Sequence, residues 1–391
     1  MTTLGRRTAS FESRARARTA GLDWWLLLTA LAVSAFGTYV IRAATESDVP
    51  GSPGFFFTRQ LAYTLVGLVL MFFMLKLDLD SLSRYVWTIY AILVASVAAV
   101  LVLGASARGS TRWIDLGPVR LQPSEIGKVV LAFVIAVVVM ERLKAMEPAR
   151  LTLMALGLAL LPAAIVFLQP DLGTSLVYVA ICLAILWVAG QPITHFWLIG
   201  GIVVVGAALV LYILPGIGLN VLQPYQVDRL TSFVDSGSDR TQSGYQLEQS
   251  KVAIGSGGAF GKGPSGATQT INDFLPEHHT DFIFAVVAEM FGFLGAGLLI
   301  AAYFVIVWRA VVIMRLAPTE LERLVAAGLV AMLAFEVFVN IGMNVGIMPI
   351  TGIPLPFMSY GGSHTLTNLI AVGVLLRIGM RGRAAGATGT A

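Results

Sequence analysis

Ten apolar runs constrain this chain more than any other feature of its sequence, because each approaches the length of a membrane-spanning helix. Such a helix needs roughly 20 mostly apolar residues. Composition agrees, since 57% of the 391 residues are hydrophobic and only 12% are charged, about half the charged share of a typical soluble domain. The sequence therefore predicts an all-α membrane protein with about ten transmembrane helices. The runs cover residues 24–41, 61–75, 85–103, 126–140, 151–168, 172–188, 196–214, 282–308, 324–345 and 361–376.

The distribution of lysine and arginine predicts how these helices are oriented. Most of the 26 basic residues fall on one side if the N-terminus lies in the cytoplasm, which places both termini there. Membrane topology accounts for where the basic residues lie, so the net charge of +4 needs no other explanation. The sequence has no basic stripe, and we therefore expect no nucleic-acid partner. The predicted organisation is a cytoplasmic basic arm over residues 1–21, a polytopic membrane domain over 22–382 and a disordered cytoplasmic tail over 383–391.

The basic residues on the opposite, outer side are more informative, because topology alone disfavours them. They are Arg42, Arg59, Arg108, Arg112, Arg120, Lys128, Arg229, Arg240, Lys251 and Lys262. An anionic ligand such as a phosphate would explain them; the alternative is pairing with nearby acids. Those acids are Asp115, Glu125, Asp228 and Asp239. The single cysteine, Cys182, excludes an intramolecular disulfide and is expected to be a small buried apolar residue.

One connection, residues 215–280, is much longer than the others and lies on the predicted outer side. Loops of this length are usually functional or disordered, and the interleaved apolar residues favour order here. Its glycine string contains Gly261-Lys262, but Gly263 stands where a phosphate loop needs Ser or Thr, so no nucleotide is expected. The glycines either bring backbone amides close to a phosphate or form a flexible turn.

Polar residues among the apolar runs are costly and are candidates for a site. Glu125 and Lys128 are three positions apart, so they share a helix face and form either an ion pair or part of a site. Asp171 either caps the sixth helix or belongs to a site. Glu289 and Glu336 lie inside apolar runs and must face other helices or a cavity; their roles are open.

The densest polar cluster, FLPEHHTDFIF, closes the long outer loop where it becomes an apolar helix. Its members are Glu277, His278, His279 and Asp281. A carboxylate at this boundary is partly desolvated, which raises its pKa and suits a general base. The alternatives are a metal site made by the two histidines and two acids, or a helix N-cap by Thr280 or Asp281.

Five strings make the chain similar to the SEDS family (shape, elongation, division and sporulation). They are RWIDLGPVRLQPSEIGK, QPDLGTS, QSKVAIGSGGAFGKG, LPEHHTDFIFAVVAE and NIGMNVGIMPITGIPLPFMSYGG, and they occur in the family's order. All ten runs match the family's ten-helix plan, and ITGIPLPF resembles the rod-shape (RodA) branch rather than the septal (FtsW) branch. The chain departs from the family at Met290, Glu336, Ala267 and His364, where an acid, Gln, Gly and a small residue are usual.

The resemblance implies a peptidoglycan glycosyltransferase that polymerises lipid II on the outer face of the cytoplasmic membrane. Polyprenyl diphosphate is the product released, and the process serves cell-wall elongation and rod shape. The family's essential acid corresponds to Asp281, which we expect to be the general base. Arg59, Glu125, Lys128 and Asp171 match polar positions of the family's central cavity. The further expected substrate-binding residues are Arg112, Gln122, Ser124, Lys251, Lys262, Glu277, His279 and Thr280.

The resemblance also implies partners and a cofactor. A class B penicillin-binding protein would crosslink the strands, because the sequence has no Ser-x-x-Lys pattern to do so itself, and membrane proteins of the elongation machinery would join it. A divalent cation, Mg or Mn, could help to stabilise the leaving pyrophosphate, at residues that the sequence does not identify. The competing interpretations are a flippase of the lipid-linked precursor and the septal polymerase of the same family. A flippase explains the outer positive charge less well, because a transporter places its site near the midplane.

Overall fold

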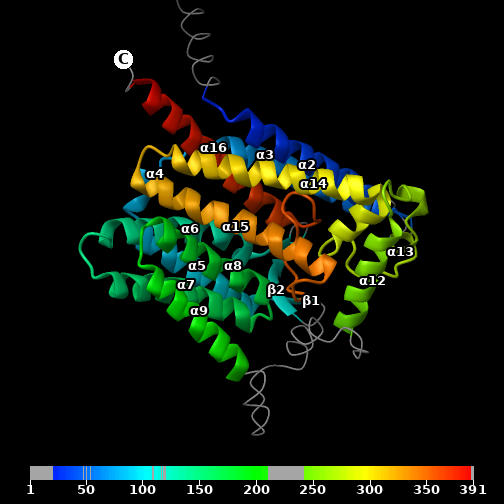
Figure 1. Ribbon diagram of the computed structural model, residues 1–391, viewed down its shortest axis with the longest axis horizontal. Coiled ribbons are helices and arrows are strands. Elements are labelled where there is room, and N and C mark those ends of the chain that lie inside the picture. Colours follow the sequence, from blue (N-terminus) through cyan, green and yellow to red (C-terminus); the bar gives the residue numbers. More distant parts are fainter. Residues whose placement is uncertain are drawn as a thin grey trace, which may run out of the picture.

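The structure is a computed structural model, and it describes residues 21–46, 48–49, 51–52, 54–107, 110–115, 117, 120–209 and 242–388. Within this part of the chain, ten apolar helices form one bundle (Figure 1), as the apolar runs predict. Eight are long and apolar enough to cross a membrane, and α8 and α9 are shorter. The ten are α2 (Trp24–Ala44), α3 (Phe55–Met74), α5 (Val86–Leu103), α6 (Pro123–Arg142), α7 (Pro148–Leu168), α8 (Leu172–Val188), α9 (Ile193–Ala208), α14 (Ile283–Arg315), α15 (Glu320–Val345) and α16 (Gly362–Thr388).

Helix α6 is central to the bundle. It packs against α5, α7, α8, α15 and α16, and every residue from 131 to 139 is buried. Its first turns contain Ser124, Glu125 and Lys128, which places polar and charged groups inside the bundle. Cys182 on α8 is buried in this core, as predicted.

The bundle has two polar ends, which we name by the segments found there. The terminal end holds both ends of the described chain and the short helix α4 (Leu79–Ser83); the loop end holds the connections to α6 and α14 (Figure 1). At the loop end, β1 (Ala105–Ala107), β2 (Ser110–Asp115) and β3 (Arg120–Leu121) form an antiparallel sheet. The helices of the long connection there are α12 (Gln242–Ser256), η2 (Pro264–Gly266) and α13 (Thr268–Ile271).

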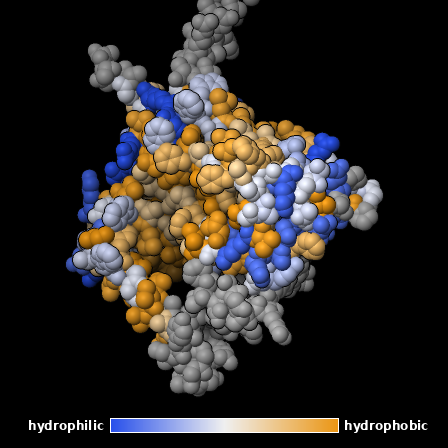
Figure 2. All heavy atoms as spheres, turned by 45° about the vertical axis from the view of Figure 1, so that its right-hand side comes forward, coloured by the Kyte–Doolittle hydropathy of each residue, from blue (hydrophilic) through white to orange (hydrophobic). Residues whose placement is uncertain are grey.

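The surface matches this arrangement. In the turned view, apolar residues cover the middle of the molecule, whereas polar residues gather along its left edge and on the lobe at its right (Figure 2). Large apolar side chains such as Trp197, Leu198 and Phe304 are more than half exposed. A helical bundle with such a surface between two polar ends is suited to a lipid bilayer.

The glycine string of the outer connection contacts a break in α14. Gly292 has φ +67°, outside helical geometry, and divides the helix. At this break the amides of Lys262 and Gly263 donate to the carbonyls of Glu289 and Met290, both at 2.9 Å. The string is therefore ordered by backbone pairing, and these amides are bonded to protein rather than directed at a phosphate. A phosphate cradle made by these two amides is therefore wrong, and their backbone pairing argues against a flexible turn.

The terminal end is closed by an ion cluster that joins the first and last helices. Asp23 accepts hydrogen bonds from Arg309 of α14 at 2.6 and 3.1 Å, and also pairs with Arg383 of α16. Burial by itself would raise the pKa of Asp23, but these hydrogen bonds and charges lower it below 3.8. Because α16 continues to Thr388, residues 383–388 are helical, and the predicted disorder is wrong there. Residues 1–20 and 389–391 lie outside the described part.

Candidate active site

Asp281 lies half-buried at the loop end, just before α14 begins. Asn340 and Asn344, one turn apart on α15, donate to its backbone carbonyl at 2.9 and 3.1 Å. The hydroxyl of Ser359 donates to the carbonyl of Thr280 at 2.6 Å. Side chains from two other segments thus fix the backbone that carries the carboxylate. The N-cap of α14 is Phe282, without a side-chain cap bond, so the predicted capping by Thr280 or Asp281 is wrong.

His279 and Arg59 meet around Tyr360. The amide of Tyr360 donates to the carbonyl of His279 at 2.9 Å, and the His279 ring lies 4.7 Å from Phe56 and 5.7 Å from Tyr360 between centroids. Burial raises the pKa of Tyr360, while the nearby Arg59 guanidinium opposes that rise. Arg59 also stacks over Phe55 at 4.3 Å. The structure therefore places a cation on the same corner as the loop that carries Asp281.

Glu277 and His278 shape the turn that leads to Asp281. Glu277 has φ +56°, and its carboxylate accepts a hydrogen bond from the Thr280 hydroxyl at 3.1 Å. His278 is 4% exposed, and its Nε2 lies 3.3 Å from Oδ2 of Asp48. Burial alone would lower the pKa of His278, but the adjacent Asp48 carboxylate outweighs burial and raises it above 6.5.

A second polar group surrounds Asp171. Its carboxylate caps α8 by accepting the Thr174 amide at 3.1 Å, and Gln122 donates to it at 3.0 Å and to Ser124 at 3.2 Å. Arg112 lies 4.0 Å from it and donates to the carbonyl of Pro170. The capping interpretation of Asp171 is confirmed; its contacts with Arg112 and Gln122 place it among predicted site residues, and its role in a site stays a prediction.

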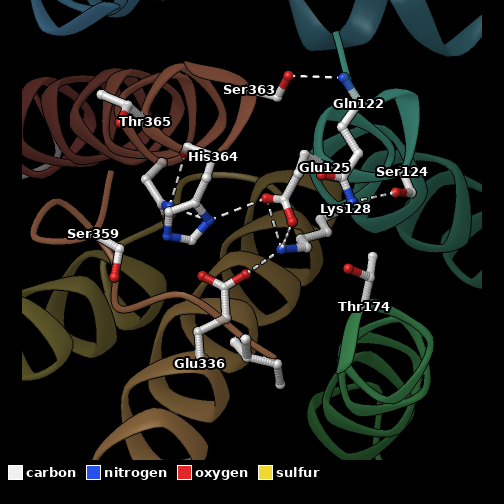
Figure 3. A network of polar contacts seen from close by, with 12 residues as sticks. Gln122, Ser124, Glu125, Lys128, Thr174, Glu336, Ser359, Ser363, His364 and Thr365 are labelled. Carbon is white, nitrogen blue, oxygen red and sulfur yellow. Dashed lines mark hydrogen bonds and ion pairs between the residues drawn. The ribbon is translucent and has the colours of Figure 1, made fainter. Parts of the chain in front are cut away.

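The charges of α6 form a buried cluster inside the bundle (Figure 3). The Lys128 ammonium lies 2.7 and 2.8 Å from the two oxygens of Glu125 and 2.6 Å from Glu336. His364 of α16 contacts Glu125 at 3.1 Å, and Asn368 contacts the same imidazole. The predicted Glu125–Lys128 ion pair is confirmed. The open role of Glu336 is resolved, since it is the second carboxylate of Lys128.

The role of Glu289 is also resolved. Its buried carboxylate accepts the amides of Gln269 and Thr270 and the Thr270 hydroxyl, at 2.9, 3.2 and 2.8 Å. Lys262 lies 3.8 Å from it. Glu289 therefore anchors α13 to α14. Lys262 belongs to this anchor, and among the described residues it shares no hydrogen bond or ion pair with Asn340, Asn344 or Ser359.

Lys251 lies beside the end of α15 that holds the Asp281 loop. Its side chain passes over Gly346, where any Cβ would come within 2.2 Å of it. Its neighbour Ser250 donates to the Asn344 carbonyl at 2.9 Å, and Asn344 in turn holds Asp281. Among the other outer cations, Arg120 pairs with Asp115 at 3.6 Å, as the pairing alternative predicts. Arg108, Arg229 and Arg240 lie outside the described residues.

One short segment, residues 355–365, contacts both the loop that carries Asp281 and the polar residues at the start of α6. Ser359 and Tyr360 contact the loop of Asp281. The Ser363 hydroxyl accepts the backbone N–H of Gln122 at 2.8 Å, and His364 contacts Glu125. Sequence reasoning missed the contacts of this segment and those of the two asparagines of α15. Their spacing at i and i+4 within an apolar run was the available signal.

Similarity to known proteins identifies the family of this chain. A family model described as a cell cycle protein, FtsW/RodA/SpoVE, matches residues 21–384. The chain belongs to this family. It is 37% identical over 357 residues to a peptidoglycan glycosyltransferase, MrdB, of Escherichia coli K12, covering 91% of this chain and 93% of that one. It is 35% identical over 364 residues to stage V sporulation protein E of Bacillus subtilis, covering 91% and 96%.

Solved structures of this family share the fold. A chain from a study titled "Structural coordination of polymerization and crosslinking by a peptidoglycan synthase complex" matches with a TM-score of 0.76 and 28% identity. That match covers 92% of this chain and 98% of the other. The rod shape determining protein RodA of Thermus thermophilus matches with a TM-score of 0.65 and 28% identity, covering 92% and 96%. The predicted family and its helical membrane fold are confirmed.

Proposed function

We propose that this family member is a peptidoglycan glycosyltransferase that polymerises lipid II and releases polyprenyl diphosphate. The observation that carries the proposal is the placement of Asp281. Its backbone is held by Asn340 and Asn344 at a polar end of the bundle, where a lipid-linked sugar would present its head group. The names of the relatives support a glycosyltransferase.

The chemistry is a displacement at an anomeric carbon. A hydroxyl of the acceptor sugar attacks that carbon, the bond to the pyrophosphate oxygen breaks, and the hydroxyl proton passes to the Asp281 carboxylate. A positioned general base contributes roughly 10²–10⁴-fold. Arg59, Arg112 and Lys251, all at the loop end, would stabilise the negative charge on the departing pyrophosphate.

The surroundings of the reaction form part of the same proposal. The loop end faces the outside of the cytoplasmic membrane and both termini lie in the cytoplasm, in line with the distribution of basic residues. A class B penicillin-binding protein crosslinks the product, and other membrane proteins of the elongation machinery assemble with the pair. The process is elongation rather than septation. A divalent cation, Mg or Mn, supplies positive charge for the leaving group when it is bound.

The decisive experiment is lipid II polymerisation by the purified chain with its penicillin-binding protein. We expect Asp281→Asn to abolish glycan strands, while Asp115→Asn, an exposed carboxylate of β2, leaves them unchanged. Thermal unfolding and partner binding serve as controls for folding. Equal rates for wild type and Asp281→Asn would remove Asp281 as the base.

The same preparation tests the flippase. If neither the wild type nor the variant forms strands, although the complex is intact and lipid crosses vesicle membranes, the chain is a transporter. The buried Glu125–Lys128–Glu336 cluster would then lie on the transport path, because charged groups in a membrane interior mark such paths.

A further inference from the structure

A cluster of side chains that could hold a metal ion lies next to Asp281, and the reaction described above assigns it no step. Asp48 follows α2, and His278 and His279 lie two and three positions before Asp281. One donor atom from each side chain lies within 4.8 Å of the other two. Residues far apart in the sequence thus bring two imidazoles and a carboxylate together.

The contacts of His278 favour a positive charge inside this cluster. Its Nδ1 lies 3.2 Å from the carbonyl of Leu275, which can only accept, so Nδ1 carries a proton and Nε2 is the atom that faces Asp48. Nε2 is buried and makes no well-directed hydrogen bond within the described residues, although Oδ2 of Asp48 is 3.3 Å away. A lone pair facing a carboxylate oxygen is repulsive. Either a second proton or a metal ion must lie between the two atoms.

The position of His279, the third side chain of the cluster, favours a metal ion over a proton between His278 and Asp48. A proton shared by His278 and Asp48 needs no second imidazole, whereas a metal ion gains a ligand from His279. The His279 ring is held in place by Phe56 and Tyr360. Two imidazoles and one carboxylate on one side of an ion leave further positions open for oxygen ligands.

We propose that Asp48, His278 and His279 bind one transition-metal dication, Mn²⁺ or Zn²⁺. The donor set argues against Mg²⁺, which prefers an all-oxygen shell, because imidazole suits the softer ions. The role of the ion rests on the proposed function: it would contact phosphate oxygens of the substrate beside Asp281. The binding site itself stands on the geometry of the three side chains.

Metal binding can be measured without substrate. The full-length chain is purified with a tag that contains no histidine, stripped with a chelator and titrated with Mn²⁺, and free Mn²⁺ is followed by its electron paramagnetic resonance signal. We expect one Mn²⁺ bound per chain, displaced by Zn²⁺ but not by a tenfold excess of Mg²⁺. Asp48→Asn and His278→Gln should each weaken binding by roughly tenfold or more.

Matched controls separate this site from general loss of charge or imidazole. Asp115→Asn removes an outer carboxylate and His195→Gln removes a histidine of α9, and both should bind Mn²⁺ as the wild type does. Thermal unfolding in chelator tests whether each variant is folded; if His278→Gln is not, Asp48→Asn decides alone. No stoichiometric binding by the wild type, or equal binding by folded Asp48→Asn, overturns the proposal and leaves a protonated His278–Asp48 ion pair.

These outcomes are independent of the polymerisation assay. A chain that binds Mn²⁺ at these residues but forms no glycan strands would retain the metal site and lose the proposed function. A chain that forms strands but binds no metal would retain the function and lose the site.

Discussion

The ammonium of Lys128 lies 2.6 Å from Oε1 of Glu336, a residue 208 positions later in the chain and on a different helix. Since Glu125 contributes a second carboxylate to the same ammonium, one lysine joins α6 to α15 in the interior of the bundle. All three side chains are buried. Removing the cation therefore leaves two carboxylates in an apolar interior.

Lys128→Met should destabilise the fold by about 3–5 kcal/mol, because breaking a buried ion pair strands the remaining charge. Glu336→Gln should cost much less, since it leaves one cation beside one carboxylate. Denaturant unfolding in detergent, followed by tryptophan fluorescence, compares the two. Equal destabilisation would mean that the ammonium does not balance both acids.

Asn344→Ala should slow polymerisation by roughly 100-fold, because a displacement of about 1 Å at a reacting group can cost that much. The side chain holds the Asp281 carbonyl at 3.1 Å. Asn272→Ala, at an exposed position after α13, is the matched control. Rates measured at saturating lipid II distinguish misplacement of the base from weaker binding. An unchanged saturated rate would show that Asn344 does not position Asp281.

Gly292→Ala should destabilise the protein by about 1–3 kcal/mol, as expected for a residue forced into the left-handed region. Gly292 has φ +67°, and a Cβ there would lie 2.3 Å from the amide nitrogen of Gly261. Gly297→Ala in the same helix meets nothing within 4 Å and should stabilise it by about 0.5–1 kcal/mol. Thermal unfolding of both variants gives the comparison, and a neutral Gly292→Ala would contradict the backbone pairing at this break.

Asp23 should make the stability of the terminal end depend on pH. Its pKa in the folded protein is lower than 3.8, so its ionised form stabilises the fold above that value. The contribution disappears as pH falls through the folded pKa. The unfolding temperature of wild type should therefore exceed that of Asp23→Asn at pH 7 and 5, and the difference should shrink below pH 4. A difference in unfolding temperature that stays constant on acidification would contradict the lowered pKa of Asp23.

The ten helices were predictable because a helix that spans a bilayer needs a long apolar segment, and each such segment is a continuous run in the sequence. The Glu125–Lys128 pair was predictable for the same reason, since three positions on one helix bring side chains together. The residues that Glu125 and Lys128 contact on other helices were not predictable. Glu336 and His364 reach the pair from α15 and α16, and which faces of separate helices meet depends on packing that no local pattern records.

The glycine string shows a different limit. Its composition suits a phosphate cradle or a mobile turn, and only the break at Gly292 reveals that its amides pair with α14. Asp48 is a similar case, because nothing near it in the sequence suggests the contact with His278. In both cases the partner lies more than 25 positions away.

The cluster of Asp23, Arg309 and Arg383 has a consequence for how the protein is made. During synthesis Asp23 at the start of α2 is made long before its partners, Arg309 of α14 and Arg383 of α16. Until they are made the carboxylate has neither cation, so these ion pairs cannot join α2 to α14 and α16 while the intervening segments are synthesised. Arg383 is therefore made last of the three partners, and a product truncated before it would lack one of the two ion pairs that join the start of α2 to later helices.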